Sequence, residues 1–149
     1  IFTYVGISLI DKLGRRSLMY IGSIGYIVSL TLISLSFILE WGGVVLPIFL
    51  FLFIASHAIG QGAIIWVYIS EIFPNHIRSY GQSFGISTHW VLAAIIPSLI
   101  PFLFGSIGPG IVFGFFAFMM VLQLIFTHFI MPETKGVSLE DLSKKLIKN

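Results

Sequence analysis

Long apolar stretches without Asp, Glu, Lys or Arg alternate with short charged segments along this chain. A helix that crosses a bilayer needs roughly 20 mostly apolar residues. Residues 17–39 and 46–70 fit one crossing each, and residues 79–132 are enough for two, divided by a turn-forming segment at 105–110. The pattern therefore predicts an all-α, polytopic membrane protein. Its four complete transmembrane helices are expected at residues 17–39, 46–70, 82–104 and 111–131, with the end of a fifth at 1–10.

The basic residues are distributed unevenly over the segments between these helices. All eight Lys and Arg residues lie in the first, third and fifth segments, at 11–16, 71–80 and 132–149. Basic loops remain on the cytoplasmic side of a membrane, so these segments and the C-terminus are predicted to be cytoplasmic. The tail, residues 133–149, is expected to form a short amphipathic helix with three leucines on one face.

Composition supports the bilayer as the solvent. Hydrophobic residues make up 57% of the chain and charged residues 9%, against about 25% charged residues in soluble domains. The net charge of +2 gives no indication of a nucleic-acid partner. The absence of cysteine excludes disulfides and thiolate metal sites, and no metal or cofactor is predicted. Because the chain starts with Ile1 inside an apolar run, we interpret it as the C-terminal part of a longer protein.

Three charged motifs follow one another at the predicted helix ends, and together they resemble a known family. They are DKLGRR from Asp11, EIFPNHIR from Glu71 and PETKG from Pro132. This series resembles the sugar porter family of the major facilitator superfamily, from the end of helix eight to the C-terminus. The resemblance implies the C-terminal six-helix half of a twelve-helix facilitator whose N-terminal half is missing here. Two departures are Lys12, where Arg is usual, and a helix-ten motif without its proline.

Polar and aromatic residues deep in the third and fourth stretches are candidates for a substrate site. Buried polar groups in membrane helices usually face the bundle interior and often mark a substrate path. The resemblance implies that Trp66 and the His89–Trp90 pair contribute to the sugar site, with His89 where Gln or Asn is usual. The complete set of candidate substrate-binding residues is Gln61, Gly62, Trp66, His89 and Trp90. Alternatively, His89 is an interior residue that bridges two helices, as we expect for His57 and His128.

Charged residues at the helix ends are candidates for a gate. Ion pairs that form in one conformation and break in another can bias alternating access, in which one helical half rocks against the other. The resemblance implies such an ionic network at the cytoplasmic face. Alternatively, these residues only anchor the topology. The candidate gate residues are Asp11, Arg15, Arg16, Glu71, Arg78 and Glu133.

The residues and the resemblance together predict a transporter and not an enzyme. The expected function is transport of a monosaccharide across a plasma or inner membrane by alternating access, with proton-coupled symport as the first choice. A facilitative uniporter, or a facilitator for an organic anion, a cyclitol or a drug, is the alternative. The expected partners are the sugar, a coupled proton, the lipid bilayer and the N-terminal half of the same protein.

Overall fold

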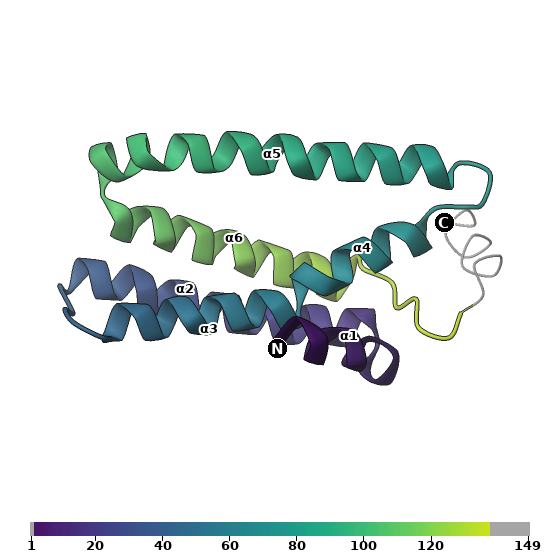
Figure 1. The fold of residues 1–149 in the computed structure, drawn as a ribbon, viewed down its shortest axis with the longest axis horizontal. Coiled ribbons are helices and arrows are strands. Elements are labelled where there is room, and N and C mark those ends of the chain that lie inside the picture. Colours follow the sequence, from purple (N-terminus) through teal and green to yellow (C-terminus); the bar gives the residue numbers. More distant parts are fainter. Residues whose placement is uncertain (1, 138–149) are drawn as a thin grey trace.

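The computed structural model describes residues 2–137, and all regular secondary structure in that range is helical (Figure 1). The prediction of an all-α fold is confirmed. The helices are α1 (Phe2–Leu13), α2 (Arg15–Ile38), α3 (Val45–Ile59), α4 (Gln61–Ile72), α5 (Arg78–Ile107) and α6 (Pro109–Phe129). The amphipathic helix predicted in the tail lies outside the described residues.

The prediction of four complete spans is also confirmed. Four helical segments of the described chain are long and apolar enough to cross a membrane: Arg15–Ile38, Val45–Ile72, Arg78–Ile107 and Pro109–Phe129. The second of these combines α3 and α4. Helix α1 corresponds to the predicted end of a fifth span and continues three residues further than expected.

Glycines form the two tightest connections. Gly14 joins α1 to α2 with φ 90°, and Gly108 joins α5 to α6 with φ 83°. Both values lie in the region that glycine occupies without a steric penalty. The segment between α5 and α6 is shorter than predicted, because Gly105 and Ser106 remain helical and only Gly108 leaves the helix. Pro109 then opens α6, where its missing N–H group has no helical partner to lose.

The span predicted as continuous over residues 46–70 is interrupted at Gly60, which is a correction to the sequence prediction. Gly60 has φ −93° and ψ −110°, far from the helical ψ of about −42°. A glycine inside a helix costs about 1 kcal/mol relative to alanine, so this is a weak point in the helix. Gly60 also packs directly on α2, because a Cβ atom at this position would lie 2.6 Å from the Cα atom of Gly22.

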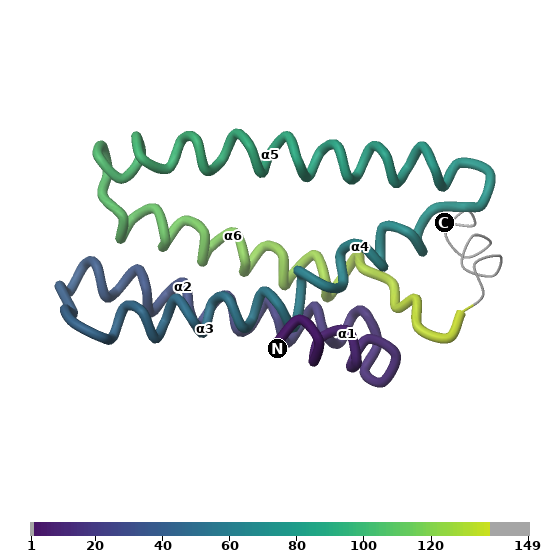
Figure 2. Tube along the Cα trace, in the orientation of Figure 1, coloured from purple at the N-terminus to yellow at the C-terminus, as the bar shows by residue number. Residues whose placement is uncertain are grey.

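Two buried clusters hold the helices together. Tyr26, Leu30, Ile33 and Ala117 form the cluster between α2 and α6. A second cluster joins α1, α2, α4 and the segment after α6, and its members include Ile10, Leu18, Ile64 and Met131. Helix α5 contacts α4 and α6 among the described helices (Figure 2). None of its residues is buried. Its two prolines therefore lie on an exposed, fully helical segment.

Candidate functional site

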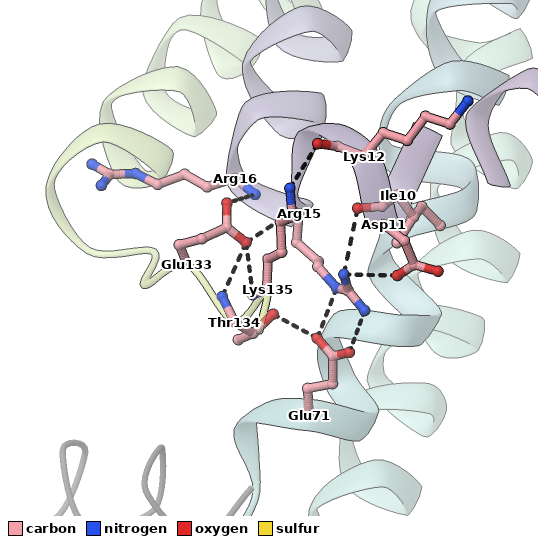
Figure 3. A network of polar contacts seen from close by, with 9 residues as sticks. All are labelled: Ile10, Asp11, Lys12, Arg15, Arg16, Glu71, Glu133, Thr134 and Lys135. Atoms are coloured by element: carbon pink, nitrogen blue, oxygen red, sulfur yellow. Dashed lines mark hydrogen bonds and ion pairs between the residues drawn. The ribbon is translucent and has the colours of Figure 1, made fainter. Parts of the chain in front are cut away.

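The three charged motifs meet in one group of polar contacts, which we call the loop network and define as Asp11, Arg15, Glu71, Glu133 and Thr134. Arg15 donates two hydrogen bonds to Glu71, from Nη2 to Oε1 at 2.7 Å and from Nε to Oε2 at 3.1 Å (Figure 3). Two parallel charge-assisted bonds of this kind are among the strongest polar contacts in proteins. Both side chains are mostly buried, with 12% and 19% exposed.

Asp11 is a weaker member of the loop network. Its Oδ1 atom lies 3.2 Å from Arg15 Nη1, but its side chain is 89% exposed. Exposed ion pairs contribute about 0–1 kcal/mol. The Arg15–Glu71 pair is therefore the principal electrostatic link between the start of α2 and the end of α4.

Glu133 binds the N-terminus of α2. Its carboxylate accepts hydrogen bonds from the backbone N–H groups of Arg15 at 3.0 Å and Arg16 at 3.1 Å. A carboxylate is favourable here because the first N–H groups of a helix lack helical partners and carry partial positive charge. Gly14 makes room for it, since a Cβ atom at Gly14 would lie 2.6 Å from Glu133 Oε2.

The segment after α6 is fixed to the same place by two further hydrogen bonds to other elements and by two within the segment itself. Thr134 Oγ1 donates to Glu71 Oε2 at 2.5 Å. Lys135 Nζ donates to the backbone carbonyl of Lys12 at 2.7 Å, close to the end of α1. The N–H groups of Thr134 and Lys135 both donate to Glu133 Oε1 at 3.0 Å. The PETKG segment thus bridges α1, α2 and α4, as Figure 3 shows.

Arg16 and Arg78 occupy different positions from Arg15. The Arg16 guanidinium donates to the backbone carbonyls of Thr127 at 3.1 Å and of His128, so it caps the end of α6. Arg78 bonds locally, to the Phe73 carbonyl at 3.3 Å and to Asn75 Oδ1 at 2.5 Å. Neither forms an ion pair with a carboxylate among the described residues. Arg78 nevertheless lines a polar cavity of about 410 Å3 together with Arg15, Glu71 and Thr134.

Three of the predicted substrate residues lie together between α4 and α5. The ring of His89 stands edge-on to Trp66, with centroids 5.0 Å apart, and to Trp90, with centroids 5.5 Å apart. Both indoles are partly exposed, Trp66 at 39% and Trp90 at 62%. The arrangement offers aromatic faces beside an imidazole, which can either donate or accept a hydrogen bond.

The two remaining candidates point elsewhere. Gln61 Nε2 donates to Ser23 Oγ on α2 at 3.1 Å. Gln61 also lines a largely apolar cavity of about 440 Å3 bordered by α2, α3, α5 and α6, which the Trp66–His89–Trp90 group does not line. Gly62 lies against His57, because a Cβ atom at Gly62 would be 2.8 Å from His57 Nε2. Gln61 therefore contacts Ser23 of α2, and Gly62 contacts His57 of α3, and neither takes part in the ring contacts of the aromatic group.

Several site residues were missed by sequence reasoning. Thr134 lies inside the quoted PETKG motif, so its polar side chain between Glu133 and Lys135 was a usable signal. The contacts of Arg16 with backbone carbonyls at the end of α6 could not be predicted, because every residue has a carbonyl group. The hydrogen bond between Tyr26 and His57 joins two long apolar stretches, and only an expectation that His57 lies at a helix interface pointed towards it.

Comparisons with known proteins identify the family of this chain. A family model described as "Sugar (and other) transporter" matches residues 1–146. The arabinose-proton symporter of Bacillus subtilis is 38% identical over 99% of this chain and 32% of its own length. D-xylose-proton symporter-like 2 of Arabidopsis thaliana is 37% identical over 99% of this chain and 29% of its own length. The chain thus spans about a third of the length of the curated relatives it matches.

The fold comparison leads to the same family. The inward-open structure of the xylose transporter XylE from E. coli superposes with a TM-score of 0.90 at 29% identity, over 97% of this chain and 32% of that one. The resemblance to the sugar porters of the major facilitator superfamily is therefore confirmed by sequence and by fold. This chain belongs to the sugar (and other) transporter family.

Proposed function

We propose that this chain forms part of the C-terminal half of a transporter that moves a monosaccharide across a membrane by alternating access. The observation that carries the proposal is the composition of α4. This short helix bears both Trp66, from the aromatic group, and Glu71, from the loop network. The two residues are five positions apart, or about 7.5 Å along a helix axis.

The aromatic group suits a sugar. Indole faces stack on the apolar C–H face of a pyranose, and an imidazole bonds a hydroxyl group. In the proposal, Trp66 and Trp90 provide the faces and His89 the hydrogen bond. Gln61 and Gly62 support the position of α4 through their contacts with Ser23 of α2 and His57 of α3.

The loop network serves as the gate in this proposal. The Arg15–Glu71 pair, Glu133 and Thr134 hold three chain segments together in the conformation described here. Each 1.4 kcal/mol of differential stability shifts a conformational equilibrium about tenfold, so a few such contacts are sufficient to bias access. Arg16 and Arg78 remain gate candidates, because Arg16 fixes the end of α6 and Arg78 lines the same cavity as Glu71.

Proton coupling is the favoured energy source. The two relatives described above are named as proton symporters. No Asp or Glu lies within the predicted spans of this chain, so a carboxylate that carries the proton of a symporter would lie outside these spans, and His89 is the titratable candidate within them. A facilitative uniporter is the second candidate. A site for an anionic solute is disfavoured, because the predicted spans also lack Lys and Arg.

The direct test is uptake by the full-length protein reconstituted in liposomes. Radiolabelled arabinose, xylose and glucose would be supplied with and without an inward-directed proton gradient. We expect saturable uptake of at least one sugar, accelerated by the gradient and reduced to the basal rate by a protonophore. Uptake at the same rate with and without the proton gradient would favour the uniporter. No uptake of any monosaccharide would contradict the proposal.

A further inference from the structure

Helix α2 binds both sides of the break that separates α3 from α4. On the α3 side, the Tyr26 hydroxyl forms a hydrogen bond with His57 Nδ1. On the α4 side, Gln61 Nε2 donates to Ser23 Oγ at 3.1 Å. The break itself, at Gly60, lies between these two contacts. The angle between α3 and α4 is therefore held from α2 by two polar links and not by the broken helix alone.

These links are closely packed where α2 meets the break, while Tyr26, Phe53 and Gln61 also line the apolar cavity of about 440 Å3. A Cβ atom at Gly22 would lie 2.8 Å from the Cα atom of Gly60, so the two backbones touch. Ser23 is fully buried and Tyr26 is 7% exposed. The Tyr26 ring also packs on Phe53, with centroids 5.0 Å apart. A side chain so enclosed has few alternative positions, so its hydroxyl fixes the His57 ring.

His57 also contacts α4 directly. Its Nε2 atom lies against Gly62, where an added Cβ atom would be 2.8 Å away. One imidazole therefore touches α2 through one nitrogen and the first turn of α4 through the other. A rotation of this ring would move against Gly62, and so against the start of the helix that bears Trp66 and Glu71.

We propose that Tyr26 and His57 form a positioning pair that transmits sugar binding at Trp66 to the loop network at Glu71. The pair holds the start of α4 at the break, so that a displacement of Trp66 turns α4 about this point and moves Glu71 near its other end. This inference rests on the proposed function, because it assigns a role within that transport cycle. Hydrogen bonds between membrane helices shift equilibria by about three- to fifteenfold, which is the size of effect expected here.

The test uses the full-length protein made free of cysteine, with Val137→Cys as a reporter. Val137 lines the polar cavity beside Glu71 and Arg78. The labelling rate of the introduced thiol with a soluble maleimide would be measured with and without saturating arabinose or xylose, alongside sugar affinity. In the parent, sugar is expected to change the labelling rate. In Tyr26→Phe, that change is expected to fall three- to fifteenfold, while sugar affinity remains within about twofold.

The chain offers a matched control on the same helix. Tyr20 on α2 bonds His128 Nδ1 on α6 at 2.9 Å, the same pair of groups at a distance from the break. Tyr20→Phe is expected to keep the parent response. If Tyr26→Phe responds like Tyr20→Phe, the proposed transmission is overturned. If the parent binds no monosaccharide, the proposed function fails, and the transmission fails with it.

A second pair of variants covers the case in which Tyr26→Phe does not fold. His57→Asn places a side-chain oxygen or nitrogen close to the position of Nδ1, whereas His57→Leu cannot form the hydrogen bond. We expect His57→Asn to keep the sugar-dependent change and His57→Leu to lose it. Equal responses in the two variants would overturn the inference.

Discussion

At the scale of single residues, Gly14 has two independent reasons to be glycine. Its φ of 90° disfavours any other residue, and an added Cβ atom would meet the Glu133 carboxylate at 2.6 Å. A non-glycine residue held at a positive φ costs of order 1–3 kcal/mol in backbone strain. We expect Gly14→Ala to lower the thermal unfolding temperature of the full-length protein and to weaken the Glu133 cap of α2.

Gly42 provides the control for that prediction. Its backbone has no positive φ, and no atom lies within 4 Å of an added Cβ. Gly42→Ala should therefore melt at the parent temperature. Equal unfolding temperatures for the two alanine variants would show that the Gly14 turn tolerates a side chain and that our account of it is wrong.

The contribution of Arg15 to sugar uptake is expected to depend on the shape of its guanidinium group as well as on its charge. Lysine keeps the charge but cannot form the two parallel bonds to Glu71. We predict that Arg15→Lys slows net sugar uptake about three- to tenfold, corresponding to the loss of roughly 1 kcal/mol of a charge-assisted bond.

Asp11→Asn is the comparison for the Arg15 variant. Asp11 meets the same guanidinium from an exposed position, so its removal should change uptake by less than about twofold. Initial uptake rates in liposomes, corrected for the amount of protein, measure both effects. A larger loss in Asp11→Asn than in Arg15→Lys would contradict the assignment of Glu71 as the principal partner.

At the scale of elements, α4 and α5 together carry the aromatic group that is proposed to bind the sugar. Trp66→Ala and Trp90→Ala remove a stacking face, and each should weaken sugar binding by about 1–3 kcal/mol. Trp90→Phe keeps a face and should cost less than Trp90→Ala. His89→Gln keeps a hydrogen-bonding group and should preserve transport, whereas His89→Leu leaves a sugar hydroxyl unpaired.

Binding to the purified full-length protein measures this group of variants. A control is Trp41→Ala, since Trp41 lies in the connection between α2 and α3, outside the aromatic group. Its affinity for sugar should match the parent. If Trp66→Ala and Trp90→Ala also bind every tested sugar as tightly as the parent, the two residues only pack and the substrate assignment loses its support.

The helices themselves could be predicted from sequence because each spanning helix must be apolar over a fixed length. The break at Gly60 could not be predicted in the same way, because residues 46–70 contain no charged residue and the interruption depends on contact with Gly22 of another helix. The same limit applies to Gln61. Its position in the sequence placed it near the aromatic residues, but its amide donates to Ser23 on α2.

At the scale of the whole molecule, topology follows from the distribution of basic residues. We predict that reporters fused after Gly43 and Gly108 lie outside, and that reporters after Gly14, Asn75 and Asn149 lie inside, because all Lys and Arg residues fall in the second group of segments. Alkaline phosphatase and fluorescent-protein fusions to the full-length protein measure the two sides. An external signal after Asn75 would overturn the orientation.

The loop network shows what charge counting can and cannot predict. Its charged members were predicted from three motifs that place acids and bases at helix ends. Which arginine pairs with Glu71 was left open, and the contact of Thr134 with Glu71 was missed, since these residues come from distant segments that only the fold brings together. The hydrogen bond between Arg78 and Asn75 could not be predicted either. From the sequence alone, Arg78 was as good a partner for Glu71 as Arg15.

Helix α4 is proposed to connect sugar binding to the loop network, and the Glu71→Gln variant separates the two. This change removes the charge that pairs with Arg15 and leaves Trp66, on the same helix, in place. In the full-length protein, net uptake of labelled sugar and equilibrium sugar affinity would be measured side by side. In the Glu71→Gln variant, net sugar uptake is expected to fall about tenfold, while equilibrium sugar affinity remains within about twofold of the parent value. Equal losses of affinity and uptake, with unchanged populations of inward-facing and outward-facing protein, would contradict this expectation.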